Sequence, residues 1–256
     1  MPTARDALLD AALTAVALLP WSAVRMVDVA SAAGVSRQTL YNEFGSKEGL
    51  ARALVRREAD AYLRGVERIL ARPLPPERNV AAVAEWTVTE AGARPLLRAL
   101  LTGCWGERLP APRPARAGAR ASAVPAQRRA DAGVPSPTDL LGQVRDRAAT
   151  ALVEGEGGWA EDAERALRCC EVVMRLALSY VVAPGHTIAA GAVPANAALR
   201  DRAARDQAVR DRAARDQAAR DQWAEPESWR PTTPTITSVI ETIFKVDTTS
   251  PRKTMP

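Results

Sequence analysis

Residues 24–50, VRMVDVASAAGVSRQTLYNEFGSKEGL, decide the fold of this chain. They contain a short apolar segment, a glycine turn and a second segment whose outer face is polar and aromatic. Val29 and Ala30 give the first segment its apolar face, and Gly34 follows it, where glycine adopts a positive φ without steric cost. This order is typical of a helix-turn-helix, whose second helix is small enough to enter the major groove of DNA.

The second segment has a buried side and a polar side. Ser36 is a good N-cap, and Leu40 and Phe44, four residues apart, form the apolar stripe. The opposite face carries Arg37, Gln38, Thr39, Tyr41 and Asn42. Arginine and glutamine can bond guanine and adenine bidentately, and the other three suit phosphate oxygens or the thymine methyl group. A solvated face on an ordinary pair of helices is the alternative, but the glycine turn, the cap and the aromatic plug together favour DNA reading.

These residues resemble a known family over about residues 3–62, namely the N-terminal domain of the TetR family of transcriptional regulators. The matching residues are Ala11-Ala12, Val29-Ala30, Ala33-Gly34-Val35-Ser36, Thr39-Leu40-Tyr41, Phe44 and Ser46-Lys47-Glu48-Gly49-Leu50. The resemblance implies that Arg37, Gln38 and Thr39 read bases or neighbouring phosphates. It further implies that Tyr41 and Asn42 grip the backbone.

Two basic residues flank the motif. Lys47 falls in the first turn of the next helix, where its charge and the helix N-terminus both favour a phosphate. Arg25 stands where the family usually has threonine or serine. We therefore expect a weaker helix cap there and a phosphate contact from the Arg25 guanidinium instead.

The rest of the chain predicts an all-α fold, with the DNA-binding domain at 2–62, its helix-turn-helix at about 25–44, and a helical effector-binding and dimerisation domain at 63–185. Apolar periodicity and proline positions predict the helices 6–19, 46–70, 78–91, 95–105, 138–154 and 160–183. Residues 107–135 show no periodicity, and six arginines face only two acids there. A solvated, disordered loop is favoured over a basic DNA-touching arm.

The helix at 160–183 is the most amphipathic of the chain, and the TetR resemblance implies a dimer interface on it. The candidate interface residues are Leu167, Cys170, Val173, Met174, Ala177, Leu178 and Val181. Packing within the chain's own core is the alternative, and both can hold because a broad stripe can face two partners. The resemblance also implies an effector pocket in the body, with Trp86, Cys104, Trp105 and Met174 as candidate lining for an apolar ligand.

Residues 186–256 form an atypical tail. The decapeptide 200–209 is repeated at 210–219 with one change, and a third copy begins at 220. Its acid-first pairs at i, i+4 and its alanines predict an exposed charged helix. Further on, residues 236–246 carry a short apolar stripe. That segment is either a displaced last helix that returns to the dimer or unrelated sequence that stays mobile.

Composition limits the function classes. The net charge is +5, yet residues 1–70 hold nine basic and eight acidic residues, so charge placement and not its sum supports DNA binding. Three cysteines without a Cys-x-x-Cys spacing, and a single histidine, His186, beside a Pro-Gly turn, argue against a zinc site, a disulfide framework and an enzyme. We expect no cofactor and no metal. No signal sequence or membrane span is legible, which favours a cytoplasmic bacterial protein, nucleoid-associated when bound.

The resulting hypothesis is a homodimeric, ligand-responsive repressor that binds a palindromic double-stranded DNA operator. A helical scaffold protein whose DNA-binding head is no longer used is the alternative. An enzyme has no motif behind it.

Overall fold

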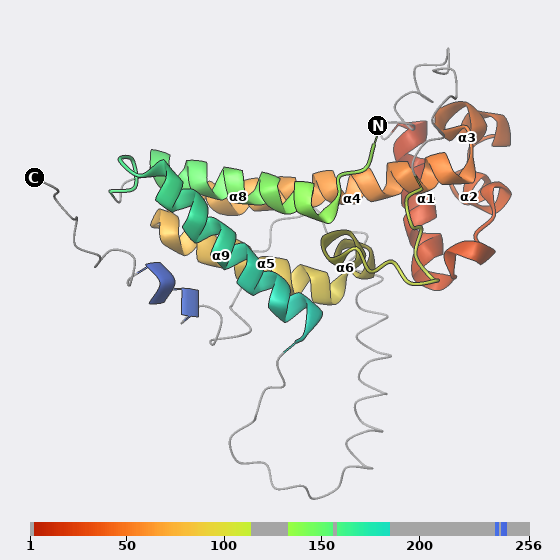
Figure 1. The fold of residues 1–256 in the computed structure, drawn as a ribbon. Helices are drawn as coiled ribbons and strands as arrows, with labels where there is room; N and C mark the ends of the chain where they lie inside the picture. Colours follow the sequence, from red (N-terminus) through yellow and green to blue (C-terminus); the bar gives the residue numbers. More distant parts are fainter. Residues whose placement is uncertain (1–2, 114–132, 156–157, 185–238, 241, 245–256) are drawn as a thin grey trace, which may run out of the picture. The chain divides into compact units, whose positions relative to one another are not determined.

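The computed structural model describes residues 3–113, 133–155, 158–184, 239–240 and 242–244, and every regular element in them is helical (Figure 1). The predicted all-α class is confirmed for this part of the chain. In order, the elements are α1 (Ala4–Leu18), a 3₁₀ turn (Trp21–Ala23), α2 (Met26–Ala32), α3 (Arg37–Phe44), α4 (Lys47–Leu70), α5 (Pro76–Ala93), α6 (Pro95–Thr102), α8 (Pro137–Glu154) and α9 (Ala163–Val182). Their ends lie within three residues of the predicted ones.

Capping residues and prolines close in the sequence define where most helices start. Thr3 and Asp6 form a capping box at the start of α1, and Ser136 and Asp139 form another at α8. In each box the hydroxyl accepts the N–H of the acid three residues on, and the carboxylate accepts the N–H of the cap. Proline occupies the first turn of α5, α6 and α8, where its missing N–H costs nothing.

Helices α1, α2 and α3 form an N-terminal head, residues 3–46, with its own small core. α1 packs across both other helices and covers the helix-turn-helix from behind, as the red and orange ribbons show (Figure 1). The most deeply buried side chains of the head are Leu8, Ala12, Val29, Leu40 and Phe44. The head therefore holds α3 in place by packing on one face while the other face stays open.

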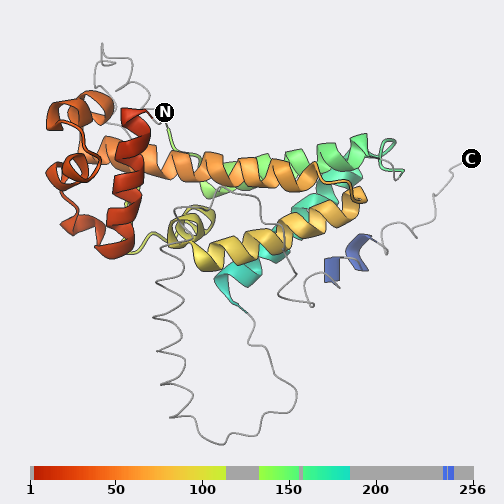
Figure 2. The same ribbon diagram turned by 180° about the vertical axis from the view of Figure 1, so that it is seen from behind.

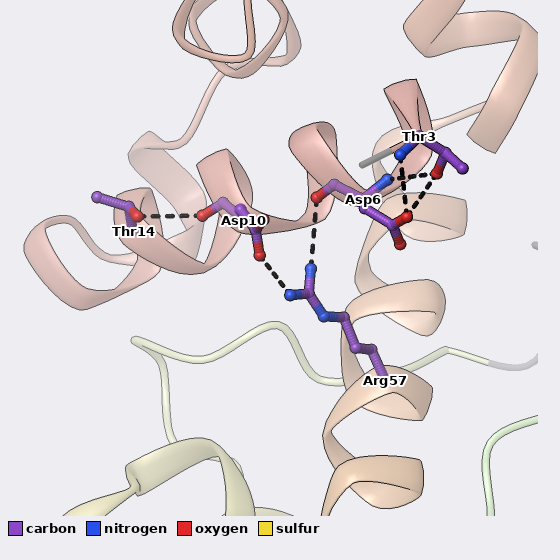
Figure 3. Close-up of polar contacts among 5 residues, drawn as sticks. All are labelled: Thr3, Asp6, Asp10, Thr14 and Arg57. Carbon is purple, nitrogen blue, oxygen red and sulfur yellow. Dashed lines mark hydrogen bonds and ion pairs between the residues drawn. The ribbon is translucent and has the colours of Figure 1, made fainter. Parts of the chain in front are cut away.

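Helix α4 joins the head to the helical body, which consists of α5, α6, α8 and α9. Its 24 residues span about 36 Å at 1.5 Å per residue. On one side Arg57 of α4 forms an ion pair with Asp10 and donates to the Asp6 carbonyl 3.4 Å away, both on α1 (Figure 3). The next residue of α4, Glu58, forms an ion pair with Arg94 at the junction of α5 and α6, with 2.7 Å between Glu58 Oε1 and Arg94 Nη2. Consecutive residues of α4 thus contact the head and the body.

The body core lies between α5, α8 and α9, which Figure 2 shows from behind. Its fully buried members include Val80, Ala84, Ala148, Leu152, Cys170, Val173 and Ala177. On α4, Tyr62 stacks on Trp86 of α5 with ring centroids 5.4 Å apart and donates to or accepts from Thr87 at 2.8 Å. Small residues dominate this core, so the helices approach one another closely.

Part of the C-terminal tail belongs to the same compact unit. Ile240 and Phe244 are buried in the body core, and the ring of Phe244 meets Trp159 edge-on at 5.7 Å. This packing agrees with a docked C-terminal helix, although its role in a dimer stays a prediction. Residues 185–238, which include His186 and the decapeptide repeat, lie outside the described residues, as does most of the 107–135 loop.

Candidate DNA-binding interface

The turn before α3 has the backbone geometry that its sequence predicted. Gly34 has a φ of 66°, a left-handed conformation that favours glycine. Ser36 then caps α3, because its hydroxyl accepts the N–H of Thr39 at 3.0 Å. Leu40 and Phe44 are 0% and 1% exposed, so they anchor the helix from below. These contacts fix which face of α3 points outward.

The outward face of α3 carries the five side chains predicted to contact DNA. Arg37, Gln38 and Asn42 are exposed, and Thr39 and Tyr41 are half-buried. The Gln38 side chain donates to Oδ1 of Asn42 at 3.0 Å, and the Arg37 guanidinium lies 5.6 Å from the centre of the Tyr41 ring. All five residues thus lie on two turns of α3, and two pairs of them contact each other.

Arg25 is the N-cap of α2, and its side chain makes no capping hydrogen bond. Its guanidinium instead pairs with Asp28, with 2.8 Å between Nε and Oδ2, and it remains 74% exposed. The weak cap follows the sequence expectation. A DNA contact by Arg25 would have to compete with Asp28, and it stays a prediction.

Lys47 lies at the first position of α4, behind the Ser46 cap, as predicted. Its ammonium group donates to the carbonyl oxygens of Ser22 at 3.3 Å and Val24 at 2.5 Å, and it lies 5.0 Å from the centre of the Trp21 ring. Two of its three donors are therefore used within the head. The sequence could not show this, since the accepting carbonyls are more than twenty residues upstream.

Sequence reasoning also missed a positioning residue, Arg5. Its guanidinium pairs with Glu43 at 3.1 Å and lies 4.7 Å from the centre of the Phe44 ring. It thereby ties α1 to the last turn of α3. No local motif marks Arg5, because its partners are 38 and 39 residues away in the sequence.

The four candidate effector residues occupy different environments. Trp86 is half-buried against Tyr62, and Met174 is 2% exposed on α9. Cys104 is exposed and Trp105 is half-buried, both after α6. Trp86 and Met174 lie on α5 and α9, which pack together, whereas Cys104 and Trp105 follow the end of α6. A pocket formed by all four stays a prediction.

A groove of about 730 Å³ lies elsewhere, between α1 and α2 of the head. None of the four candidate effector residues lines it. Its lining is mainly small and apolar, and comprises Ala7, Asp10, Ala11, Thr14, Ala15, Leu18, Leu19, Val24, Arg25, Asp28, Val29, Ala32 and Ala33.

The predicted dimer stripe on α9 is largely covered by the chain itself. Buried inside the protomer are Cys170, Val173, Met174, Ala177 and Val181. Only Leu167, 37% exposed, and the half-buried Leu178 keep surface for a partner. Intramolecular packing against α5 and α8 thus accounts for most of the stripe, and the pattern alone could not tell a core helix from an interface helix.

In the described part of the chain, no group of three or more His, Cys, Asp and Glu side chains is placed to hold a metal ion. Burial, together with the neighbouring Cys169, raises the pKa of the Cys170 thiol to about 12, which keeps it protonated at neutral pH. No described helix is long and apolar enough to cross a membrane.

Comparison with known proteins places the N-terminal region. Residues 8–54 match the family of bacterial regulatory proteins known as the tetR family. The HTH-type transcriptional regulator AlkX of Mycobacterium tuberculosis is 41% identical over 106 residues, which are 39% of this chain and 47% of that protein. The chain therefore spans about half the length of the curated relative that it matches.

Two solved structures align with more of the chain. The TetR family repressor AlkX from Dietzia sp. is 23% identical and has a TM-score of 0.40, covering 71% of this chain and 85% of that one. The fatty acid degradation regulator FadR from Bacillus halodurans is 14% identical and has a TM-score of 0.42, covering 71% of this chain and 86% of that one.

Proposed function

We propose that this chain is a transcriptional repressor of the tetR family of bacterial regulatory proteins, the family that residues 8–54 match. It binds a palindromic operator as a homodimer and leaves the operator when a small apolar ligand binds. One observation carries the DNA-binding part of this proposal. The polar face of α3 is exposed and ordered, while Leu40 and Phe44 lock its other face into the head.

The DNA contacts fall into two groups by chemistry. Arg37 and Gln38 have the donors and acceptors to read base edges in the major groove. Thr39, Tyr41 and Asn42 suit phosphate oxygens, which position the helix without reading sequence. Arg25 and the remaining donor of Lys47 are the outer candidates.

A homodimer follows from the reach of α3. One helix of eight residues covers only a few base pairs, so two copies related by a two-fold axis are needed to read a palindrome. Large apolar side chains on the outer side of α9 support a partner surface there, namely Leu167, Val172 and Val182 at 37%, 48% and 63% exposed.

Ligand response would act through α4, which contacts both head and body. A ligand in the body, near Trp86 or Met174, lowers operator affinity only by its differential affinity for the DNA-binding and the released states. Cys104 and Trp105, between the body and the head, are the further candidates. Arg57 and Glu58 support this route, since they tie α4 to α1 and to Arg94.

The test starts from a random double-stranded DNA library, from which the full-length protein selects its operator. Fluorescence anisotropy then measures Kd at about 0.15 M salt. Loss of a bidentate base contact costs about 1–3 kcal/mol, so Arg37→Ala should weaken each half-site about 5- to 150-fold. The matched control is Arg68→Ala, an exposed arginine in the last turn of α4, at the end of that helix away from the head.

Enrichment of no sequence, or equal affinity of wild-type and Arg37→Ala proteins, would defeat the proposal. The chain would then be a helical binding protein with a disused head.

A further inference from the structure

The segment after α6, which includes the first residues of the 107–135 loop, returns to the head. Gly103, with a φ of 74°, ends α6, and residues 103–113, the crossing segment, then run without helical structure (Figure 1). The Arg108 carbonyl oxygen accepts the N–H of Trp21 at 2.9 Å, and Pro110 is buried. Residues more than 85 positions from Trp21 are thus attached to the head.

The far end of the crossing segment reaches the start of α4. The Arg113 carbonyl oxygen accepts a hydrogen bond from the Arg52 guanidinium at 3.3 Å. Arg52 is 7% exposed, so this anchor is well protected from solvent. The Arg113 side chain itself is exposed. Its backbone is therefore held while its charge faces outward.

The charge of Arg113 is felt at the first turn of α4. The pKa of Glu48 is lowered chiefly by its own backbone N–H; burial opposes this, and the Ser46 hydroxyl and the charges of Arg113 and Arg52 lower the pKa further. Glu48 is exposed and directly follows Lys47. Arg113 thus lies close enough to the N-terminus of α4 to act on a carboxylate there.

The N-terminus of α4 is where we expect a phosphate contact, but its lysine, Lys47, already donates hydrogen bonds within the head. The Lys47 ammonium group donates hydrogen bonds to the Ser22 and Val24 carbonyl oxygens and lies over the Trp21 ring. Trp21 in turn holds the crossing segment through Arg108. The same residue therefore contacts Lys47 through its ring and the crossing segment through its backbone N–H.

We propose that Arg113, delivered by the crossing segment, is a DNA phosphate contact that lies outside the helix-turn-helix. This inference rests on the proposed DNA-binding function and extends its contact surface to a residue 61 positions after Arg52. An arginine is well suited to the role, because its planar guanidinium binds phosphate oxygens bidentately. The contact would add affinity without adding sequence preference.

The test uses the operator selected by the full-length protein and measures Kd from about 0.05 to 0.3 M salt. Each lost phosphate contact lowers the slope of log affinity against log salt by about 0.9, so a dimer of Arg113→Ala should lose about 1.8. The base preference at each operator position should stay unchanged. Arg113→Lys should keep most of the slope, since it keeps the charge, and the control Arg68→Ala should keep all of it.

The outcomes separate the two proposals. If the wild-type protein binds no operator, the proposed function fails and this inference fails with it. If the wild-type protein binds and Arg113→Ala keeps the full salt slope, only the role of Arg113 is overturned. Thermal unfolding of both variants verifies that the fold is intact, since the anchoring hydrogen bond uses the Arg113 backbone and survives the substitution.

Discussion

The N-terminal head and the helical body are both made of helices packed on an apolar core, but the residues that indicate their roles lie in different places. In the head these residues are on the surface and close together in the sequence, as Arg37 to Asn42 are. In the body they are buried and far apart, as Tyr62 and Trp86 or Glu58 and Arg94 are. Local spacing in the sequence therefore predicts the surface site. The sequence pattern of a packed interior, in contrast, is the same whether the residues form a core, a pocket or a dimer interface.

This difference makes a general prediction about variants. Changes inside the body should lower stability and leave the operator affinity of the folded protein unchanged. Changes on the outer face of α3 should do the reverse. A body variant that is fully folded at the assay temperature but no longer binds DNA would break the comparison.

The largest effect is expected at Tyr62, which is fully buried between α4 and α5. Tyr62→Ala removes the ring that stacks on Trp86 and should cost about 3–5 kcal/mol, as for other large aromatic truncations. Tyr62→Phe keeps the ring and loses only the hydrogen bond to Thr87, at about 1 kcal/mol. Urea denaturation at one protein concentration measures both, and similar midpoints for the two variants would contradict the stacking role.

Gly65 on α4 should give the next largest effect. A Cβ there would lie 2.2 Å from Cη2 of Trp86, closer than any real contact. Overpacking of this kind costs about 1–3 kcal/mol. In Gly65→Ala combined with Trp86→Leu the clash disappears, so the double variant should be less destabilised than the sum of the single ones. Strict additivity would show that the tryptophan moves aside freely.

Ser36 provides a head variant for comparison. Ser36→Ala removes the cap of α3 and should cost about 1 kcal/mol of stability. Operator affinity should also fall, because the first turn of α3 carries Arg37 and Thr39. Ser31→Ala, on the exposed side of α2, is the matched control and should change neither the unfolding midpoint nor Kd. An unchanged midpoint in Ser36→Ala would mean that packing of Leu40 and Phe44 alone defines the helix start.

The smallest effect is a pH dependence at the junction of head and body. Burial raises the pKa of Glu58 above the ordinary range, although Arg94 opposes this. A raised pKa in the folded state means that the Glu58 contribution to stability is complete in acid and is lost as pH rises through the folded-state pKa. Glu58→Gln is neutral throughout, so its melting temperature relative to wild type should rise between acidic and neutral pH. Parallel curves would mean that Arg94 fully compensates the buried charge.

The sequence predicted the head more completely than the body for a physical reason. Caps and glycine turns depend on neighbours within four residues, so Ser36, Gly34 and Pro95 mark their helix ends without knowledge of the fold. Ion pairs and ring contacts across helices carry no such local signal. Arg5, Arg57 and Arg94 accordingly went unnoticed until their partners on other helices were known.

Periodicity identified α9 as amphipathic, but it could not say what each part of the apolar stripe faces. In the protomer α5 and α8 cover most of the stripe, and the role of its exposed part in a dimer stays a prediction. An apolar side chain gains the same free energy from burial against either partner. The identity of the partner is therefore absent from the pattern.

By itself the sequence determined the all-helical fold, the helix ends and the exposed polar face of α3, because each follows from backbone preferences and spacing over a few residues. Only the tertiary structure decided which residues from distant parts of the chain lie near that face or in the body core. It turned Lys47 inward to carbonyls more than twenty residues upstream, brought Arg113 to the start of α4, and placed Ile240 and Phe244 in the body core. These contacts join residues far apart in the chain, and their geometry exists only once the helices have packed.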